Sequence, residues 1–166
     1  MREYLVKQKL KFGGEKFDIL DENGQVVYQA TGSFFQIPKS FILKDRNGRV
    51  VSGVQKKVFS IFPQFKVEMK NGQTFWFKKG LSFFGDRYRL TGFDYQVKGN
   101  MWDLNFQLLD DRNQVVAEIS KEIFHLTDHY SIRVYDESIR EMVLSLVVAI
   151  DYVEAMEDRT SRKRNS

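Results

Sequence analysis

Residues 137–158 read ESIREMVLSLVVAIDYVEAMED, and this stretch decides the fold. Apolar residues recur there at three- and four-residue steps, which predicts an α-helix over 137–158. One helical face would carry Ile139, Met142, Val143, Leu146, Ile150 and Val153. The other faces would carry Leu144, Val147, Val148 and Ala149. Ser145 is the only polar residue in the run 142–150, and a helix that is apolar all round must be buried, so we expect a core element.

A membrane span is the alternative interpretation of this helix. The uninterrupted apolar run covers residues 142–150, about 14 Å at the helical rise, whereas the hydrocarbon core of a bilayer is about 30 Å thick. Asp151, Glu154 and Glu157 follow directly, and burying them in lipid would be costly. We therefore expect the helix to be surrounded by protein.

The residues before the helix are typical of a β-sandwich or barrel, with short segments rich in Phe, Val, Ile and Tyr between turn signals. Asp21–Gly24, Asp45–Gly48 and Asn71-Gly72 place Asn-Gly where a tight hairpin needs a positive φ. The opening MREYLVKQKLKF alternates polar and apolar residues and predicts a strand, not a signal peptide.

An internal duplication runs through these predicted strands. Residues 41–59 (FILKDRNGRVVSGVQKKVF) align without a gap to 106–124 (FQLLDDRNQVVAEISKEIF), with seven of nineteen positions identical. Two shorter matches upstream keep the same order, pairing 14–17 with 85–88 and 28–32 with 95–99. We expect two related halves, about 12–77 and 83–134, within one domain over 1–158.

Charge is distributed unevenly along the chain. The net charge of +4 comes from residues 159–166, RTSRKRNS, which we expect to be a disordered basic tail. Residues 44–89 hold 11 Lys or Arg against 3 Asp or Glu, while 90–158 hold 5 against 14. One part of the domain is therefore basic and the other acidic.

The basic segment is the best candidate for a functional surface. Its candidate residues for binding lipid or another anion are Lys56, Lys57, Lys66, Lys70, Lys78, Lys79, Arg87 and Arg89. Clustered basic residues suit an anionic membrane surface, and the aromatic run 75–77 beside Lys78 leaves nucleic acid as a less favoured partner. The alternative is an ordinary solvated exterior with lysines that protect strand edges.

Catalytic and metal chemistry finds little support in the sequence. The chain has no cysteine, no phosphate-binding loop, and no bidentate Glu to complete an EF-hand loop at Asp21 or Asp45. His125 and His129 stand four apart, but no third ligand or oriented nucleophile accompanies them. We expect no cofactor, no metal site and no catalytic residue. An enzyme remains the alternative, with Asp151 and either histidine as the groups to inspect.

Three segments carry a resemblance to a known family: 4–9 (YLVKQK), 119–121 (ISK) and 146–151 (LVVAID). Together they resemble the LURP-one-related family over nearly the whole chain. The resemblance implies about twelve antiparallel strands in a barrel around a buried C-terminal helix, as in the Tubby C-terminal domain and the phospholipid scramblases. Scramblases use cysteine-rich acylation and an acidic calcium segment, neither of which this chain matches.

The expectation from sequence is thus a mainly β (α+β) barrel from two duplicated halves that encloses an apolar helix. We expect a non-enzymatic binding domain of undefined role in the cytoplasm. Its expected partner is either an unidentified protein or an anionic phospholipid membrane, which it would bind peripherally through the face formed by 44–89 and the tail. Binding of a small molecule in the interior is a further alternative, which a helix that fills the barrel would oppose.

Overall fold

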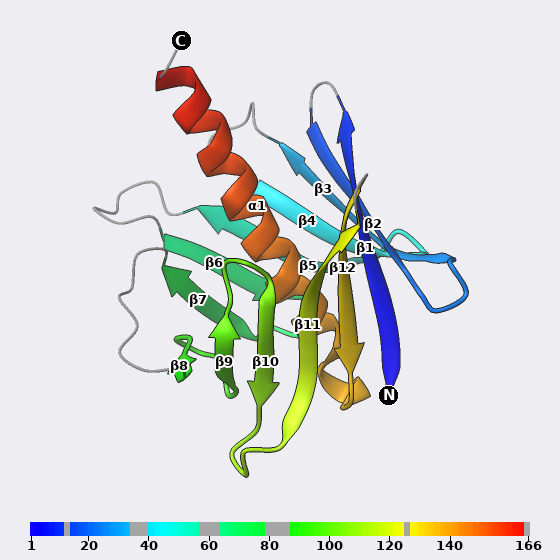
Figure 1. Ribbon diagram of the computed structural model, residues 1–166, viewed down its shortest axis with the longest axis vertical. Helices are drawn as coiled ribbons and strands as arrows, with labels where there is room; N and C mark the ends of the chain where they lie inside the picture. Colours follow the sequence, from blue (N-terminus) through cyan, green and yellow to red (C-terminus); the bar gives the residue numbers. More distant parts are fainter. Residues whose placement is uncertain (12–13, 34–39, 57–63, 79–86, 125–126, 165–166) are drawn as a thin grey trace.

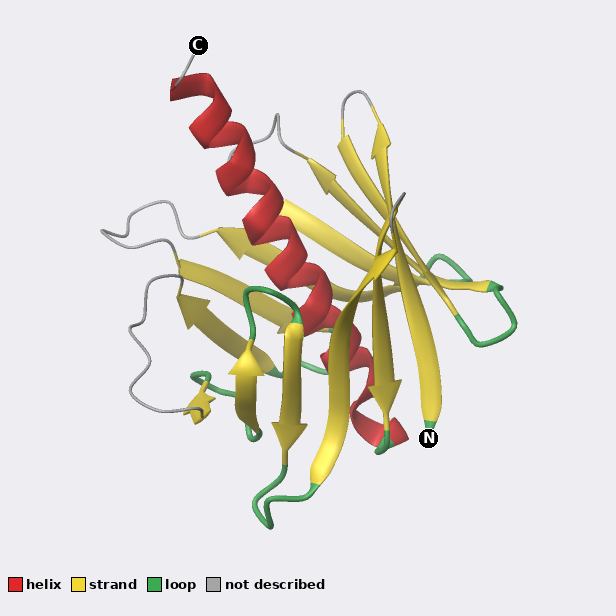
Figure 2. Ribbon diagram, in the orientation of Figure 1, coloured by secondary structure: helices red, strands yellow, loops and turns green. Residues whose placement is uncertain are grey.

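A computed structural model of the chain describes residues 1–11, 14–33, 40–56, 64–78, 87–124 and 127–164. These residues form one antiparallel sheet that curls around a long C-terminal helix (Figure 1; Figure 2). The strands are β1 (Arg2–Lys11), β2 (Gly14–Leu20), β3 (Val26–Ser33), β4 (Ser40–Asp45), β5 (Val50–Lys56), β6 (Gln64–Met69), β7 (Thr74–Lys78), β8 (Arg87–Arg89), β9 (Gln96–Asn100), β10 (Asn105–Leu109), β11 (Val115–Phe124) and β12 (Thr127–Val134). A 3-10 turn over Glu137–Ile139 leads into α1 (Arg140–Arg164). The mainly β class expected from the sequence is confirmed.

The strand order keeps the strands of each predicted half together. Neighbours in the sheet follow the order β7-β6-β5-β4-β3-β2-β1-β12-β11-β10-β9-β8, so β2 to β7 are contiguous, β8 to β12 are contiguous, and β1 lies between the two groups. In the β4–β5 hairpin Phe41 faces Val54, and in the β10–β11 hairpin Phe106 faces Ile119, each residue 65 positions further along. Both hairpins have a register shift at the corresponding place, after Leu43 and after Leu108. The hairpin geometry thus repeats residue for residue.

The two junctions between the halves differ. Seven residue pairs join β1 to β2, whereas one isolated bridge, between Trp76 and Thr91, joins the β7 and β8 ends among the described residues. Gly92 presses against β7 beside this bridge, since a Cβ on it would lie 2.5 Å from the Thr74 carbonyl oxygen. The sheet surrounds the helix, but the closed barrel that we expected is not confirmed, because no continuous ladder spans this junction in the residues described.

Helix α1 fills the interior of the sheet, as Figure 1 shows. Every residue from Met142 to Val153 is buried. The two polar residues in that stretch are tied to strands: Ser145 Oγ lies 2.7 Å from Ser52 Oγ on β5, and the Tyr130 hydroxyl of β12 donates to Asp151 Oδ1 at 2.7 Å. Such bonds offset the cost of burying polar groups. The same two hydrogen bonds set the rotation of α1 about its own axis and its position along the sheet.

The helix is longer at its C-terminal end than predicted. It continues through Arg164, so 159–164 are helical where we expected a disordered tail. The physical reason is that no Gly or Pro interrupts residues 140–164, and Ala, Met, Glu, Lys and Arg there are good helix formers. Within the described residues, no helix has the length and apolar character required to cross a membrane.

Candidate functional site

The outer surface at the β7–β8 junction combines basic positions with Trp76, all on the consecutive strands β6 to β9. Trp76 lies opposite Lys66 in the β6–β7 ladder and forms the bridge to Thr91. Its backbone amide donates to the Thr91 carbonyl at 2.8 Å. Phe75 and Phe77, on either side of Trp76, are buried at 0% and 2% exposure, so alternation directs Trp76 to the outer face.

The ladder between β8 and β9 continues the same surface. Arg87 is in register with Lys98 and Arg89 with Gln96, while the intervening pair includes fully buried Val97. Arg89 precedes Thr91 by two residues, about 7 Å along an extended chain. We call the positions gathered here the seam surface: Lys66, Trp76, Lys78, Arg87, Arg89 and Lys98.

Lys66 has the best-defined surroundings on the seam surface. Its ammonium lies 5.4 Å from the centre of the Trp76 ring, within the range of a cation–π contact. It also forms an ion pair with Glu68, two residues away on the same face. Among the basic residues of the seam surface, the structure describes the side chains of Lys66 and Lys98, and Glu68 pairs with the first of them.

The other basic residues singled out from the sequence have different locations. Lys56 ends β5 opposite Phe65, at a register position on the side of the sheet that carries the core. Lys70 is exposed at the β6–β7 turn, four residues and about 13 Å from Lys66. Lys57 and Lys79 lie outside the described residues. The basic segment therefore supplies positions at the β7–β8 junction, at a turn and at a strand end, and only the first set adjoins an aromatic side chain at the surface.

The residues considered for catalysis do not form a described cluster. His125 lies outside the described residues, and His129 is placed in β12 in register with Lys7 and Glu122. Asp151 is 6% exposed and accepts the hydroxyl of Tyr130, which gives it a structural function inside the protein. No group of three or more metal-ligating side chains occurs among the described residues. The absence of a catalytic centre stays a prediction.

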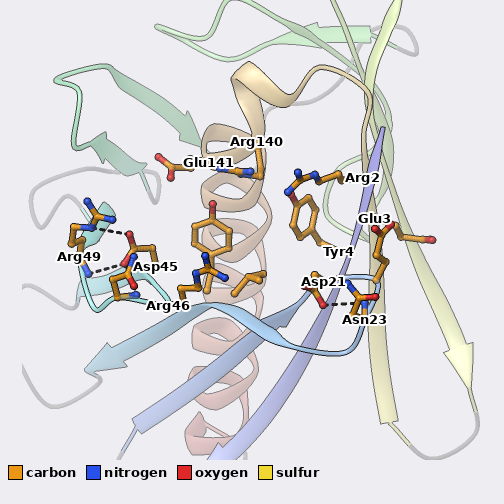
Figure 3. A pocket seen from close by; sticks show the side chains of 14 residues that line it. Arg2, Glu3, Tyr4, Asp21, Asn23, Asp45, Arg46, Arg49, Arg140 and Glu141 are labelled. Carbon is orange, nitrogen blue, oxygen red and sulfur yellow. Dashed lines mark hydrogen bonds and ion pairs between the residues drawn. The ribbon is translucent and has the colours of Figure 1, made fainter.

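A cavity that the sequence did not indicate lies where α1 begins. It has a volume of about 530 Å³ and is bounded by the β2–β3 turn, the β4–β5 turn, the start of β1 and the first residues of α1 (Figure 3). Arg2 and Arg140, which line it, are 138 positions apart, and neither belongs to a motif. Only the β1–β12 pairing and the helix placement bring them together, so no sequence pattern could have revealed the site.

Comparison with known proteins agrees with this architecture. The family model of LURP-one-related proteins matches residues 2–151. The uncharacterized protein YxjI of Bacillus subtilis (strain 168) is 24% identical over 154 residues, which cover 92% of this chain and 94% of that protein. An X-ray structure of a protein from Arabidopsis thaliana superposes with a TM-score of 0.59 at 19% identity, over 92% of this chain and 91% of that one, a similarity of fold. Because the family match spans nearly the whole sequence, the chain belongs to the LURP-one-related family.

Proposed function

We propose that this protein is a non-enzymatic binding domain that associates peripherally with anionic phospholipid through the seam surface. The observation that carries the proposal is the pairing of Lys66 with the partly buried Trp76 on the outer face, where Trp76 bridges to Thr91, two residues beyond Arg89. A tryptophan beside lysine and arginine suits the membrane interface, because the indole enters the headgroup region while the cations stay at lipid phosphates.

The filled interior supports a site on the outer surface. Val143, Leu144, Leu146 and Val147 are 0% exposed and pack inside the sheet. A lipid-sized ligand would have to displace this helix, at a cost in buried apolar area that no ligand contact replaces. A membrane surface instead requires only an exposed patch.

Electrostatics supports a salt-dependent mode of binding. Each basic residue close to an anionic leaflet contributes about 1 kcal/mol, and this attraction falls off within a Debye length. The seam surface includes five basic positions: Lys66, Lys78, Arg87, Arg89 and Lys98.

Flotation with vesicles tests the proposal. The full chain is mixed with vesicles of phosphatidylcholine alone or with about 30% phosphatidylserine, at low and at high salt. We expect flotation only with the anionic vesicles at low salt, and its loss in the double variant Lys66→Glu/Arg89→Glu. The matched control is Arg112→Glu/Lys121→Glu, which makes the same change in net charge at exposed positions away from the seam.

Two results would reject the membrane function. One is that the wild-type protein does not float with anionic vesicles at low salt. The other is that the control double variant reduces flotation as much as the seam variant, since binding would then depend on net charge and not on this surface.

A further inference from the structure

The cavity at the start of α1 has the size and lining of a binding site for a small polar molecule. Its volume of about 530 Å³ falls within the range of ligand pockets. Its walls come from three hairpin-forming strands, their turns and the helix (Figure 3). It shares no residue with the seam surface, so the two sites can be changed separately by mutation.

Most of the carboxylates that line the cavity are occupied by local hydrogen bonds. Asp21 Oδ1 accepts the backbone amides two and four residues further along its turn, at 3.0 and 2.9 Å. Asp45 Oδ1 accepts the equivalent amides of its own turn, both at 2.9 Å. Glu3 Oε1 accepts Ser131 Oγ at 2.6 Å and Arg133 Nε at 3.3 Å. These three carboxylates keep their negative charge, but their hydrogen bonds hold them in place at the two turns and on β1.

The arginines are less well satisfied. Arg140 Nη1 lies 3.4 Å and Arg2 Nε 3.9 Å from the same oxygen, Oε2 of Glu137. Strong charge-assisted hydrogen bonds are 2.7–2.9 Å long, so both contacts are loose. Two guanidiniums thus share one oxygen of Glu137, and neither contact is short. The cavity lining as a whole holds four arginines and five carboxylates. Arg140 Nε is also buried without a hydrogen-bond partner in the residues described.

Two buried tyrosines complete this side of the cavity. Tyr4 and Tyr28 are 2% and 6% exposed, and both line it. The Tyr4 hydroxyl points to the Glu137 carboxylate at 3.5 Å, and the Arg140 guanidinium carbon lies 5.9 Å from the centre of the Tyr28 ring. Burial raises the pKa of Tyr28, an effect that the nearby Arg140 partly opposes, so its hydroxyl stays protonated and able to donate at neutral pH.

The start of the helical segment is already capped, because the Asp136 side chain accepts the Ser138 backbone amide and the Arg140 backbone amide donates to the Glu137 carbonyl. The arginine side chains, and not the helix end, are therefore the groups that an anion would contact. In Figure 3, Arg2, Tyr4 and Arg140 lie close together, and Glu141 extends to the other side of Arg140.

We propose that this cavity binds the carboxylate or phosphate group of a small molecule between Arg2 and Arg140. Guanidinium groups match the planar and multidentate geometry of both anions. Glu22 and Glu141 also line the cavity, and their charge would oppose a ligand with several anionic groups. The site therefore selects a single anionic group attached to a neutral or cationic body.

Titration followed by NMR tests this site with inorganic phosphate and acetate as probes. The full chain receives each anion at constant ionic strength, with chloride as the reference, while the Nε–H resonances of Arg2 and Arg140 are recorded. We expect saturable shifts with phosphate and acetate and no saturation with chloride. Arg140→Gln should weaken the response at least about tenfold, because a charge-assisted bond is lost.

The Arg2→Gln variant gives a second test in case Arg140→Gln does not fold. The Arg2 side chain is 62% exposed, so its replacement should leave the fold intact. It should weaken the response of Arg140 to phosphate, whereas the matched control Arg112→Gln, at an exposed turn, should not. Shifts that never saturate, or saturable shifts that survive in the Arg2→Gln/Arg140→Gln double variant, would overturn the site.

Vesicle flotation of the Arg2→Gln variant distinguishes the two sources of the anion. Retained flotation with phosphatidylserine vesicles, together with a lost phosphate response, assigns the cavity to a soluble ligand. Loss of both assigns it to a lipid headgroup. Because Lys66→Glu/Arg89→Glu leaves the cavity unchanged, failure of the seam surface and failure of the cavity give different results.

Discussion

The Tyr130 hydroxyl donates a 2.7 Å hydrogen bond to Asp151 Oδ1 inside the sheet, and so joins β12 to α1. Asp151 is 6% exposed and follows directly on the apolar run of the helix. A buried carboxylate is costly unless it is hydrogen-bonded, and this contact meets part of that requirement. Asp151 thus has a structural function that its sequence context did not disclose.

Replacing Tyr130 by Phe should lower the free energy of unfolding by about 2 kcal/mol, because it leaves a buried charged acceptor without this donor. Urea denaturation measures the change. Tyr135→Phe is the matched control: Tyr135 is 41% exposed and bonds to Glu118 at 3.2 Å, so its loss should cost less than about 0.5 kcal/mol. Equal effects of the two variants would contradict the structural function of Asp151.

The stability of the protein should depend on the volume of the side chains that α1 places in the core. Leu146 is 0% exposed within the sheet, so Leu146→Ala should destabilise the protein by about 2–5 kcal/mol through lost burial and a residual cavity. Val50→Ala, at a side chain that is 46% exposed, should change stability by less than about 0.5 kcal/mol. A Leu146→Ala variant as stable as the Val50→Ala variant would rule out the central position of α1.

Gly24 and Gly92 have the same φ of +74°, so a comparison of their alanine variants distinguishes backbone strain from close packing. A methyl group added to Gly24 would have no atom within 4 Å, whereas one added to Gly92 would lie 2.5 Å from the Thr74 carbonyl oxygen. Gly24→Ala should cost about 1–2 kcal/mol from left-handed strain alone. Gly92→Ala should lower the free energy of unfolding clearly more, since it also forces β7 away at the Trp76–Thr91 bridge. Equal unfolding midpoints of the two variants in urea would show that β7 and Gly92 are not in contact.

The elements of this fold were predictable where a local pattern specifies them. The apolar run 142–150 is compatible only with a buried helix, and the Asn-Gly pairs are typical of hairpin turns. The alignment of 41–59 with 106–124 predicts the same strand register in two hairpins, as the structure has it. The predicted disordered tail was wrong for 159–164, because the Arg and Lys residues there favour a helix and no Gly or Pro ends α1 before them. The single bridge at the β7–β8 junction depends on how the two halves meet, which no local pattern records.

The free energy of unfolding at acidic pH should depend on the ionisation of Asp45. Hydrogen bonds from the Arg49 amide, together with those from Asn47, lower the pKa of this carboxyl below its usual 3.8. Because the pKa of Asp45 is lower in the folded state than in the unfolded state, the ionised carboxylate stabilises the fold fully at a pH above its unfolded-state pKa. This stabilisation is lost as the pH falls through the folded-state pKa. Asp45→Ala should therefore be less stable than wild type at pH 7, with the difference shrinking below pH 3.8.

Urea midpoints measured from pH 7 down to pH 2 check this expectation, with Asp111→Ala at an exposed turn position as the control. The control should follow the wild-type pH profile. A gap between Asp45→Ala and wild type that stays constant below pH 3 would contradict the lowered pKa of Asp45.

The candidate sites were less predictable than the fold. Lys66, Arg87 and Arg89 were predicted from charge, but strand register was needed to show that Lys66 lies opposite Trp76 and that Arg87 and Arg89 pair with β9 beyond the bridge. Arg2 and Arg140 were not predicted, because isolated arginines carry no signal until the fold places them beside one carboxylate. Sequence thus indicates which residues can bind an anion, and the three-dimensional arrangement indicates which of them act together.

The fluorescence of Trp76 tests the membrane function most directly. In a Trp102→Phe background Trp76 is the only tryptophan, and vesicles that contain phosphatidylserine with brominated acyl chains quench an indole that enters the interface. We expect quenching and a blue shift with these vesicles at low salt, and their loss at high salt and in Lys66→Glu/Arg89→Glu. Vesicle-bound protein whose Trp76 emission is neither quenched nor shifted would contradict the claim that the seam surface faces the membrane.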